Sequence, residues 1–437
     1  MRLTELSLAN FKGFEQLDLD FEKDITVLAG INGIGKSSIL SAICVILSRA
    51  LPEFTPSRAK PRYFEDDDIY LDKTALEVFL SLSVADQPLD VGIQRVRNIE
   101  NESDRFILLR PVEGEINRED LKQVLRSRTL TGNLKEGEQE TRKILADLKK
   151  TKNQPIAIYF SPRRRLPGKP RTMPEQKPFN VVQAYSFALD EREVELRDFL
   201  HWFNTQAKLD KQQKVQKNVL NTLQSVVTAF IPEFTNLRLE ENPRLAFVIE
   251  KNGKPFQLHQ LSDGERGLLA IVFDLTRRLA IANPESADPI KEGCAVVMVD
   301  EVELNLHPTW QRRVLERLTA TFKNCQFIVT THSPLVLGEV QARCVRFLER
   351  EEDTDKVIST IPSEAYGLDA NQMLSRMGAL ERNKEVIKNL RQLYRLIDDE
   401  DFDEARKAMT PLIEKLGESD PEITRARSLI KFLEGDE

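Results

Sequence analysis

The sequence predicts an α/β fold: a mixed sheet flanked by helices, with an antiparallel β subdomain, a helical lobe and a C-terminal helical appendage. Three apolar runs are typical of strands buried on both faces, at residues 25–29, 295–299 and 326–331. Alternating apolar and polar residues between 76 and 109 predict a small antiparallel meander. Apolar positions recur at helical spacing between residues 386 and 433, so the end of the chain is expected to be helical.

The composition limits the classes of partner. The chain has 437 residues and a formal net charge of −7, so contact with nucleic acid or an anionic membrane would need a local basic patch. No stretch has the apolar length of a membrane span, and residues 1–6 predict a strand and not a signal peptide. The cysteines lack paired spacing and predict isolated thiols in a reducing cytoplasm: Cys44, Cys294, Cys325 and Cys344.

Residues 30–37, with the sequence GINGIGKS, fit the phosphate-binding loop pattern G-x-x-x-x-G-K-[ST]. An apolar strand precedes this loop and an amphipathic helix follows it, which is the order that the pattern requires. Glycines let main-chain N–H groups surround phosphates at the N-terminus of that helix. Lys36 is expected to reach the β- and γ-phosphates, and Ser37 to bind Mg²⁺. The predicted nucleotide-binding residues are Gly30, Asn32, Gly33, Gly35, Lys36, Ser37 and Ser38.

The apolar run at 295–299 ends in two acids, Asp300 and Glu301. Downstream of a phosphate-binding loop, this pattern indicates a Walker B motif. Asp300 would hold Mg²⁺ together with Ser37, and Glu301 would polarise the attacking water. Without Lys36 upstream, a core strand capped by two surface acids would be the better interpretation.

The third run leads into residues 330–334, with the sequence TTHSP. We predict that His332 lies near the γ-phosphate, where an imidazole can change its charge near physiological pH. With Glu301 it completes the predicted catalytic pair. His307, in the ELNLHP stretch at 303–308, has no partner at metal-ligand spacing, so a structural or interface role is predicted for it.

Residues 261–265, with the sequence LSDGE, precede an apolar helix. Alone, this pattern indicates only a helix cap. In order with the other motifs it resembles the signature sequence of ABC-type ATPases, which closes over the nucleotide held by another subunit. The resemblance implies that Ser262, Gly264 and Glu265 act in trans. Asp263 and Glu265 replace the more usual glycine and glutamine, as in the non-transporter branch of that family.

The separation of the motifs predicts four regions. About 225 residues lie between Lys36 and Ser262, too many for a transporter ATPase and too few for long coiled-coil arms. The predicted regions are an ATPase lobe with the meander (1–110), an insertion with a basic Pro-rich loop (111–180), a helical lobe with the signature, Walker B and His332 (181–345), and a helical docking region (346–437).

One expected element has no clear counterpart. No Q-loop glutamine can be assigned, and Arg163 or a neighbour stands at its place after the strand that begins at Ile156. The basic run at 163–165 fits an ordinary solvated loop and contact with nucleotide or nucleic acid equally well.

The chain as a whole resembles the compact SMC/RecF/OLD-like ABC ATPases of bacterial antiphage defence. The likeness includes residues 8–14 (LANFKGF), the strand that leads to Arg163, and residues 366–368 (YGL), and it points to the PtuA family of Septu and retron ATPase subunits. It implies an ABC-type P-loop ATPase head that uses ATP and Mg²⁺. It also implies a homodimer or larger homo-oligomer that regulates an HNH nuclease of the PtuB kind.

Two other functions stay open at this stage. One is a RecF-like repair or recombination ATPase that binds DNA directly, and the other is an ATP-gated scaffold with negligible turnover. The acids at residues 398–401 fall in a turn between predicted helices, so we expect no nuclease site in this chain. Nucleic acid would then be reached directly or through the partner.

Overall fold

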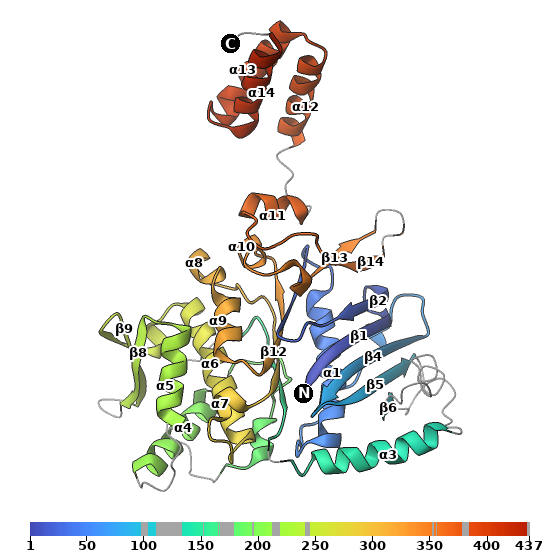
Figure 1. Cartoon of the computed structure of the whole chain (residues 1–437), viewed down its shortest axis with the longest axis vertical. Helices are drawn as coiled ribbons and strands as arrows, with labels where there is room; N and C mark the ends of the chain where they lie inside the picture. The colour runs from blue at the N-terminus through green and yellow to red at the C-terminus, as the bar shows by residue number, and fades with distance from the viewer. Residues whose placement is uncertain are drawn as a thin grey trace. The chain divides into compact units, whose positions relative to one another are not determined.

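The computed structural model describes the parts of the chain that carry the predicted motifs. They are residues 1–97, 104–110, 133–151, 153–164, 166, 179–194, 196–211, 219–240, 245–351, 354, 356–377 and 384–434. The chain divides into two compact units, Met1–Met373 and Leu374–Glu437 (Figure 1). Most of the predicted basic loop, including Arg165, lies outside the described residues.

A six-stranded sheet forms the centre of the first unit, in the order β14-β13-β3-β12-β11-β7. Its strands run parallel except at the β13–β14 edge, where the pairing is antiparallel. The three apolar runs occupy its middle strands, so the predicted mixed sheet is confirmed. Its strands are β3 (Ile25–Gly30), β7 (Ile156–Phe160), β11 (Ala295–Val299), β12 (Cys325–Thr331), β13 (Val345–Arg350) and β14 (Val357–Thr360).

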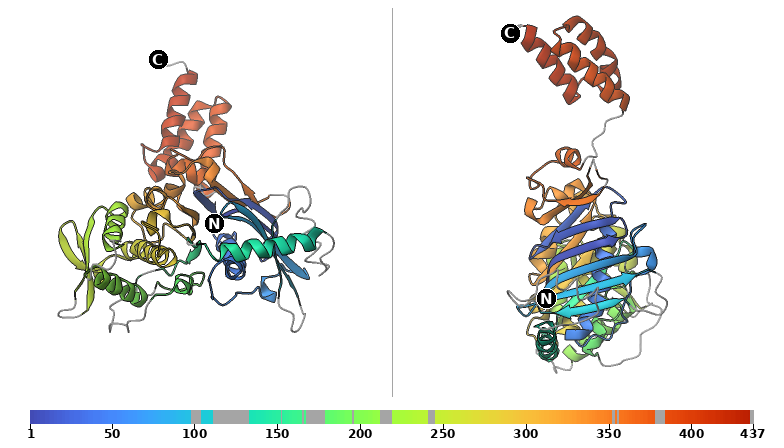
Figure 2. Two further views of the ribbon diagram at one scale, coloured as in Figure 1. Left: turned by 60° about the horizontal axis from the view of Figure 1, so that its bottom comes forward. Right: turned by 90° about the vertical axis from the view of Figure 1, so that its right-hand side faces the viewer.

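An antiparallel five-stranded sheet lies beside it, in the order β2-β1-β4-β5-β6, and confirms the predicted meander (Figure 2). Its strands are β1 (Arg2–Phe11), β2 (Phe14–Asp20), β4 (Ala75–Val84), β5 (Gln87–Val96) and β6 (Arg105–Leu109). Helix α3 (Asn133–Leu148) packs against β6 and against the helix between the sheets.

Helix α1 (Lys36–Phe54) packs between the two sheets. It shares one apolar cluster with β1, β4 and β5 on one side and with Val296, Met298 and Ile328 on the other. In the described part of the chain it is the one helix long and apolar enough to cross a membrane, contrary to the expectation that no stretch has this length, but most of it is buried in this core. The burial fixes its first turn, and therefore Lys36, against the central sheet.

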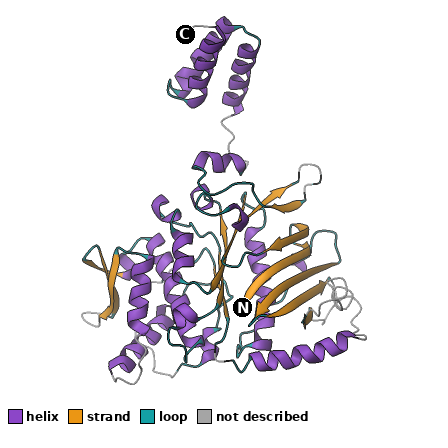
Figure 3. Ribbon diagram, viewed as in Figure 1, coloured by secondary structure: helices purple, strands orange, loops and turns teal. Residues whose placement is uncertain are grey.

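The helical lobe combines helices with a three-stranded sheet. Figure 3 shows its helices in purple and its strands in orange. Phe199, Phe203, Phe247 and Phe273 form its aromatic centre, and the rings of Phe199 and Phe273 stack 4.3 Å apart. Such pairs contribute about 0.5–1.5 kcal/mol beyond their buried area. Its elements are α4 (Leu196–Lys211), α5 (Val219–Phe230), α6 (Asp263–Ala282), β8 (Phe234–Glu240), β9 (Ala246–Lys251) and β10 (Lys254–Gln257).

Two sequence predictions about this lobe had different outcomes. The sequence KNGK at residues 251–254, between two apolar runs, predicts a hairpin turn, and this is confirmed, with Asn252 and Gly253 at positive φ as a type I′ turn requires. Apolar residues at helical spacing also predict a helix from Tyr185 to Phe203, and its first half is wrong. Residues 185–194 form turns and irregular segments, in which the Tyr185 hydroxyl donates to the carbonyl oxygen of Pro155 and the carbonyl oxygen of Ala188 accepts from the N–H of Tyr159 in β7.

Short helices connect the central strands: α7 (Pro289–Glu292), α8 (Pro308–Gln311), α9 (Val314–Thr321) and α10 (Pro334–Leu337), with α11 (Ala370–Arg376) at the unit boundary. The second unit contains α12 (Lys384–Asp398), α13 (Phe402–Leu416) and α14 (Pro421–Glu434), which enclose their own apolar core. It begins at Leu374 and not at the predicted residue 346, because β13 and β14 belong to the central sheet.

Candidate nucleotide-binding site

The register of the central sheet brings the predicted motifs to one edge. Thr331 pairs with Ala29, and Val299 pairs with Val329 and Phe160. Because these strands are parallel, the chain leaves all of them at their carboxyl ends on the same edge, where ligands bind in open α/β sheets. The loops after β3, β7, β11 and β12 therefore meet there.

The glycine loop after β3 requires glycine at two positions because a Cβ there would clash. Gly30, Gly33 and Gly35 all have positive φ, at 146°, 77° and 107°. A Cβ on Gly30 would lie 2.5 Å from the carbonyl oxygen of Leu348, and one on Gly35 would lie 2.3 Å from the ring of Phe14. No side chain caps the start of α1, so its first N–H groups are available to an anion.

Lys36 is buried at the centre of the edge, and its ammonium group has three polar partners. Its Nζ donates to the carbonyl oxygens of Gly30 and Ile31, both at 2.9 Å, and lies 3.3 Å from Nδ1 of His332. Burial lowers the pKa of Lys36 to about 8, although the carboxylates of Asp300, Glu303 and Glu301 oppose the shift. A phosphate arriving here would exchange these partners for stronger, charge-assisted hydrogen bonds.

His332 lies at the end of β12 and faces the lysine. Burial and the charge of Lys36 lower its pKa, while Glu303 and Glu301 raise it less strongly. The imidazole is therefore neutral near pH 7, and its Nδ1 can accept a hydrogen bond from Lys36. The main-chain N–H of His332 donates to Oε1 of Glu303 at 2.6 Å, which fixes the start of this segment.

Asp300 and Glu301 follow β11 and are held by a residue of the neighbouring strand. The hydroxyl of Thr330 donates to Oδ1 of Asp300 at 2.5 Å and accepts from the N–H of Glu301 at 2.8 Å. The Tyr159 hydroxyl lies 3.4 Å from Oδ2 of the same aspartate. Glu301 has a φ of 48°, a left-handed conformation that is costly for a residue with a Cβ and needs support from its surroundings.

The oxygen groups at this edge fit a magnesium ion. Mg²⁺ prefers carboxylate and hydroxyl oxygens together with phosphate oxygens. Asp300 is buried beside Lys36, Ser37 is exposed on the first turn of α1, and Oε2 of Glu303 is buried without a hydrogen-bond partner in the described structure. The donor set therefore matches the predicted pair Ser37 and Asp300, with Glu303 close by. Among the described residues, no cluster of three or more His, Cys, Asp or Glu is arranged to hold a metal.

The predicted signature segment begins α6 and forms a capping box. Ser262 caps the helix, its hydroxyl lies 2.9 Å from Oε2 of Glu265, and Glu265 pairs with Lys251 at 2.6 Å. Burial raises the pKa of Glu265, but the contacts with Lys251 and Ser262 bring it below its usual value. A Cβ on Gly264 would lie 2.2 Å from the carbonyl oxygen of Asn305, so packing within the chain already requires glycine there.

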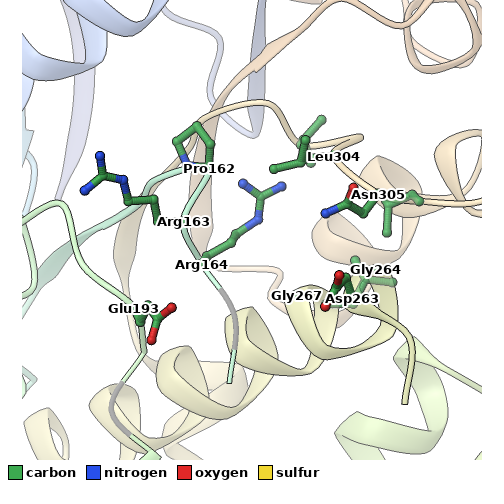
Figure 4. Close-up of a pocket in the computed structure, with 12 residues that line it drawn as sticks. Pro162, Arg163, Arg164, Glu193, Asp263, Gly264, Gly267, Leu304 and Asn305 are labelled. Atoms are coloured by element: carbon green, nitrogen blue, oxygen red, sulfur yellow. The ribbon is translucent and has the colours of Figure 1, made fainter. Parts of the chain in front are cut away.

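A cavity of about 360 Å³ borders both the signature segment and the turn after β11 (Figure 4). Residues from four parts of the chain line it: the loop after β7, Glu193, the start of α6, and the segment from Val302 to Leu306. His307 lies just beyond, where its Nδ1 accepts from the N–H of Thr309 and caps α8, which is a structural role.

Sequence reasoning missed three residues that complete this edge: Tyr159, Glu303 and Thr330. Thr330 stood in the TTHSP stretch, but no pattern shows that its hydroxyl reaches the adjacent strand. For the place after β7 the sequence offered Arg163 or a neighbour, without showing which residue turns inward. Of the two described arginines of the run at 163–165, Arg164 is buried and Arg163 is exposed.

The fold and this edge define a P-loop ATPase of the AAA/ABC type. Residues 25–338 match the family described as "AAA domain, putative AbiEii toxin, Type IV TA system", and the chain belongs to that family.

Known proteins extend this assignment. The chain is 28% identical to the "Retron Ec83 probable ATPase" of Escherichia coli, over 80% of this chain and 72% of that protein. It is 25% identical to the "Retron Vc95 probable ATPase" of Vibrio cholerae serotype O1 biovar El Tor, over 87% and 80%. A shorter match, 31% identical over 31% of this chain and 22% of the relative, is to the Septu protein PtuA of Bacillus mycoides. The predicted likeness to antiphage ATPases is thus confirmed.

Among solved structures, the SMC head domain from Thermotoga maritima is similar at 18% identity and a TM-score of 0.43. The match covers 82% of this chain and 99% of that domain.

Proposed function

We propose that this chain binds and hydrolyses ATP at the carboxyl edge of its central sheet. The observation that carries the proposal is the meeting of Lys36, His332 and the Asp300–Glu301 pair at one edge, beside a loop in which Gly30 and Gly35 leave no room for a Cβ. Gly30, Asn32, Gly33, Gly35, Lys36, Ser37 and Ser38 would bind the nucleotide. Glu301 would take the proton of the attacking water.

Each neighbouring residue has a task in this reaction. Lys36 would neutralise the β- and γ-phosphates once they replace its present carbonyl partners. His332, neutral and 3.3 Å from Lys36, would accept or donate a hydrogen bond at the γ-phosphate. Ser37 and Asp300 would hold Mg²⁺, which when bound neutralises phosphate charge in the transition state. Thr330 would keep Asp300 and Glu301 in place.

The reaction site would be completed by a second copy of the chain. The hydrogen bonds described for Ser262 and Glu265 remain within their own helix cap and with Lys251. This supports an ATP sandwich in which Ser262, Gly264 and Glu265 of one copy contact the nucleotide of another. Homodimers or larger rings would form when ATP is bound and separate after hydrolysis.

We further propose that the assembly regulates a separate nuclease in antiphage defence, an HNH protein of the PtuB kind. The likeness to retron and Septu ATPases supports this role. The second unit offers a docking surface, since Phe432 of α14 is 80% exposed although the unit has its own core.

The central experiment is Glu301→Gln in the full chain. This variant should bind ATP, hydrolyse it at a small fraction of the wild-type rate, and remain in a larger assembly in size-exclusion chromatography with ATP and Mg²⁺. Unchanged turnover would show that Glu301 is not the base. ATP binding without phosphate release by the wild type would instead support a scaffold.

The nuclease role needs a separate measurement. The full chain should co-purify with the product of an adjacent nuclease gene, and loss of residues 374–437 should remove that association while ATP binding persists. DNA binding by the chain alone, dependent on ATP, would favour the RecF-like alternative.

A further inference from the structure

Arg164 occupies the place where a Q-loop residue was expected, but it faces inward. It follows β7, and the N–H of Asp300 donates to the carbonyl oxygen of Phe160 at 2.9 Å, so the loop after β7 and the turn after β11 leave the sheet together. Arg164 is only 6% exposed, whereas the adjacent Arg163 is exposed. In Figure 4 the two side chains point in different directions.

The partners of the buried guanidinium are main-chain carbonyls. Its Nη1 donates to the oxygen of Asp300 at 2.5 Å and to that of Ser161 at 3.3 Å, and its Nη2 donates to the oxygen of Glu301 at 2.6 Å. Burial lowers the pKa of Arg164 to about 10, so it remains charged near neutral pH. A rigid fork of donors is the group that can hold two successive carbonyls at once.

These two carbonyls belong to the residues that carry the predicted chemistry. Glu301 is in the left-handed conformation, which a residue with a Cβ keeps only where its surroundings support it. The Thr330 hydroxyl accepts from the N–H of Glu301, and Arg164 donates to the carbonyl oxygens of Asp300 and Glu301. The peptide between Asp300 and Glu301 is therefore held from both sides.

The same arginine borders the signature helix. It lines the cavity with Asp263, Gly264 and Asn305, and a Cβ on Gly267 would lie 3.6 Å from its carbonyl oxygen. The loop that carries Arg164 therefore lies between the Walker B turn and the start of α6.

We propose that Arg164 is a positioning residue for ATP hydrolysis, which orients Glu301 by holding the carbonyls of Asp300 and Glu301 from the side of the signature helix. This inference rests on the proposed ATPase function. Arg164 touches neither phosphate nor water in this role. Its loss should lower kcat and leave the binding of ATP by the glycine loop nearly unchanged.

The test compares Arg164→Gln and Arg164→Lys with Arg58→Gln, which removes the same charge from an exposed position in the loop after α1. We expect both Arg164 variants to lower kcat by roughly tenfold to a hundredfold, as misplacement of a reacting group by about 1 Å does. The KM for ATP and the Kd of a non-hydrolysable ATP analogue should change by less than about threefold. A fall in kcat without a change in ATP binding shows that the lost interaction acts in the transition state. Lysine should not rescue the rate, since one ammonium cannot replace the fork.

Hydrogen exchange of the peptide spanning residues 298–306 provides a measurement that does not depend on turnover. It should be faster in Arg164→Lys, the variant that keeps the buried charge and the fold, and unchanged in Arg58→Gln. Exchange and kcat in the Arg164 variants like those of Arg58→Gln would overturn the inference. If the wild-type protein has no turnover, the proposed function fails, and the exchange of this peptide still decides whether Arg164 holds the turn.

Discussion

The edge of the central sheet and the start of α6 differ in how completely this chain provides their contacts. At the edge, Lys36 uses three partners and Asp300 is held from the neighbouring strand. At α6, Ser262 bonds only within its own cap, at a surface that carries both Asp263 and Glu265. The contacts at the sheet edge are complete within one chain. At the start of α6, a ligand could replace the hydrogen bonds of the helix cap. On this difference we base the proposal that the two regions act in different subunits.

The largest expected effect comes from inactivating the two regions in separate variants and then mixing the two purified proteins. Lys36→Ala should lower ATP turnover by roughly a hundredfold or more, because a preorganised charge at the phosphates is lost. Ser262→Ala should lose about 1 kcal/mol of helix capping and most of its turnover, while its ATP binding remains.

Mixing the two inactive proteins should restore part of the phosphate release, since mixed dimers contain one intact composite site. Each variant alone, at the same total concentration, is the control. No recovery, with mixed assemblies demonstrated by a tag on one variant, would mean that the signature does not act in trans.

The second effect is a loss of stability when the buried ion pairs in the middle of α6 are removed. Asp274 is buried and pairs with Arg277 and Arg278, both at 2.7 Å; burial raises its pKa, but the two guanidinium groups lower it well below its usual value. Asp274→Ala would leave two buried cations unpaired and should cost about 3–5 kcal/mol of unfolding free energy. Asp403→Ala, on an exposed helix, should change the midpoint of chemical denaturation little; equal midpoints for both variants would contradict this account.

A smaller effect is expected at the hydroxyl that joins two strands at the edge. Thr330→Val keeps the shape but leaves Oδ1 of Asp300 and the N–H of Glu301 without this partner, which should cost about 1–3 kcal/mol. The unfolding free energy and kcat should both fall. Thr319→Val, which removes only a hydroxyl bond to its own helix, is the control. Equal effects of the two changes would show that Thr330 is not a special contact.

The smallest effect is the pH dependence of nucleotide binding. The pKa of Lys36 is about 8 without nucleotide, and phosphates would raise it. Binding should therefore take up a proton above pH 8, and the affinity for ATP should fall by up to about tenfold per pH unit there. Calorimetry at pH 9 in buffers of different ionisation enthalpy measures this uptake. A value near zero would mean that Lys36 remains charged before ATP arrives.

The sequence alone determined the elements that depend on local chemistry. Glycines at positions of positive φ, apolar runs that end in acids, and a Ser–x–x–Glu cap are readable because their causes lie within a few residues. The three central strands, the glycine loop and the start of α6 were predicted on this basis. The second unit and the helix expected from Tyr185 were placed less well, since their boundaries depend on pairing with distant strands.

Only the tertiary structure decided how these elements act on one another. Parallel register brought β3, β7, β11 and β12 to one edge, burial lowered the pKa of Lys36, and Thr330 and Arg164 joined the acidic turn from both sides. These contacts connect residues that are 29 to more than a hundred positions apart, and nothing in the local pattern of a threonine or an arginine indicates its partner. The physical reason is that local sequence sets backbone conformation, whereas desolvation and hydrogen-bond partners are set by what packs against it.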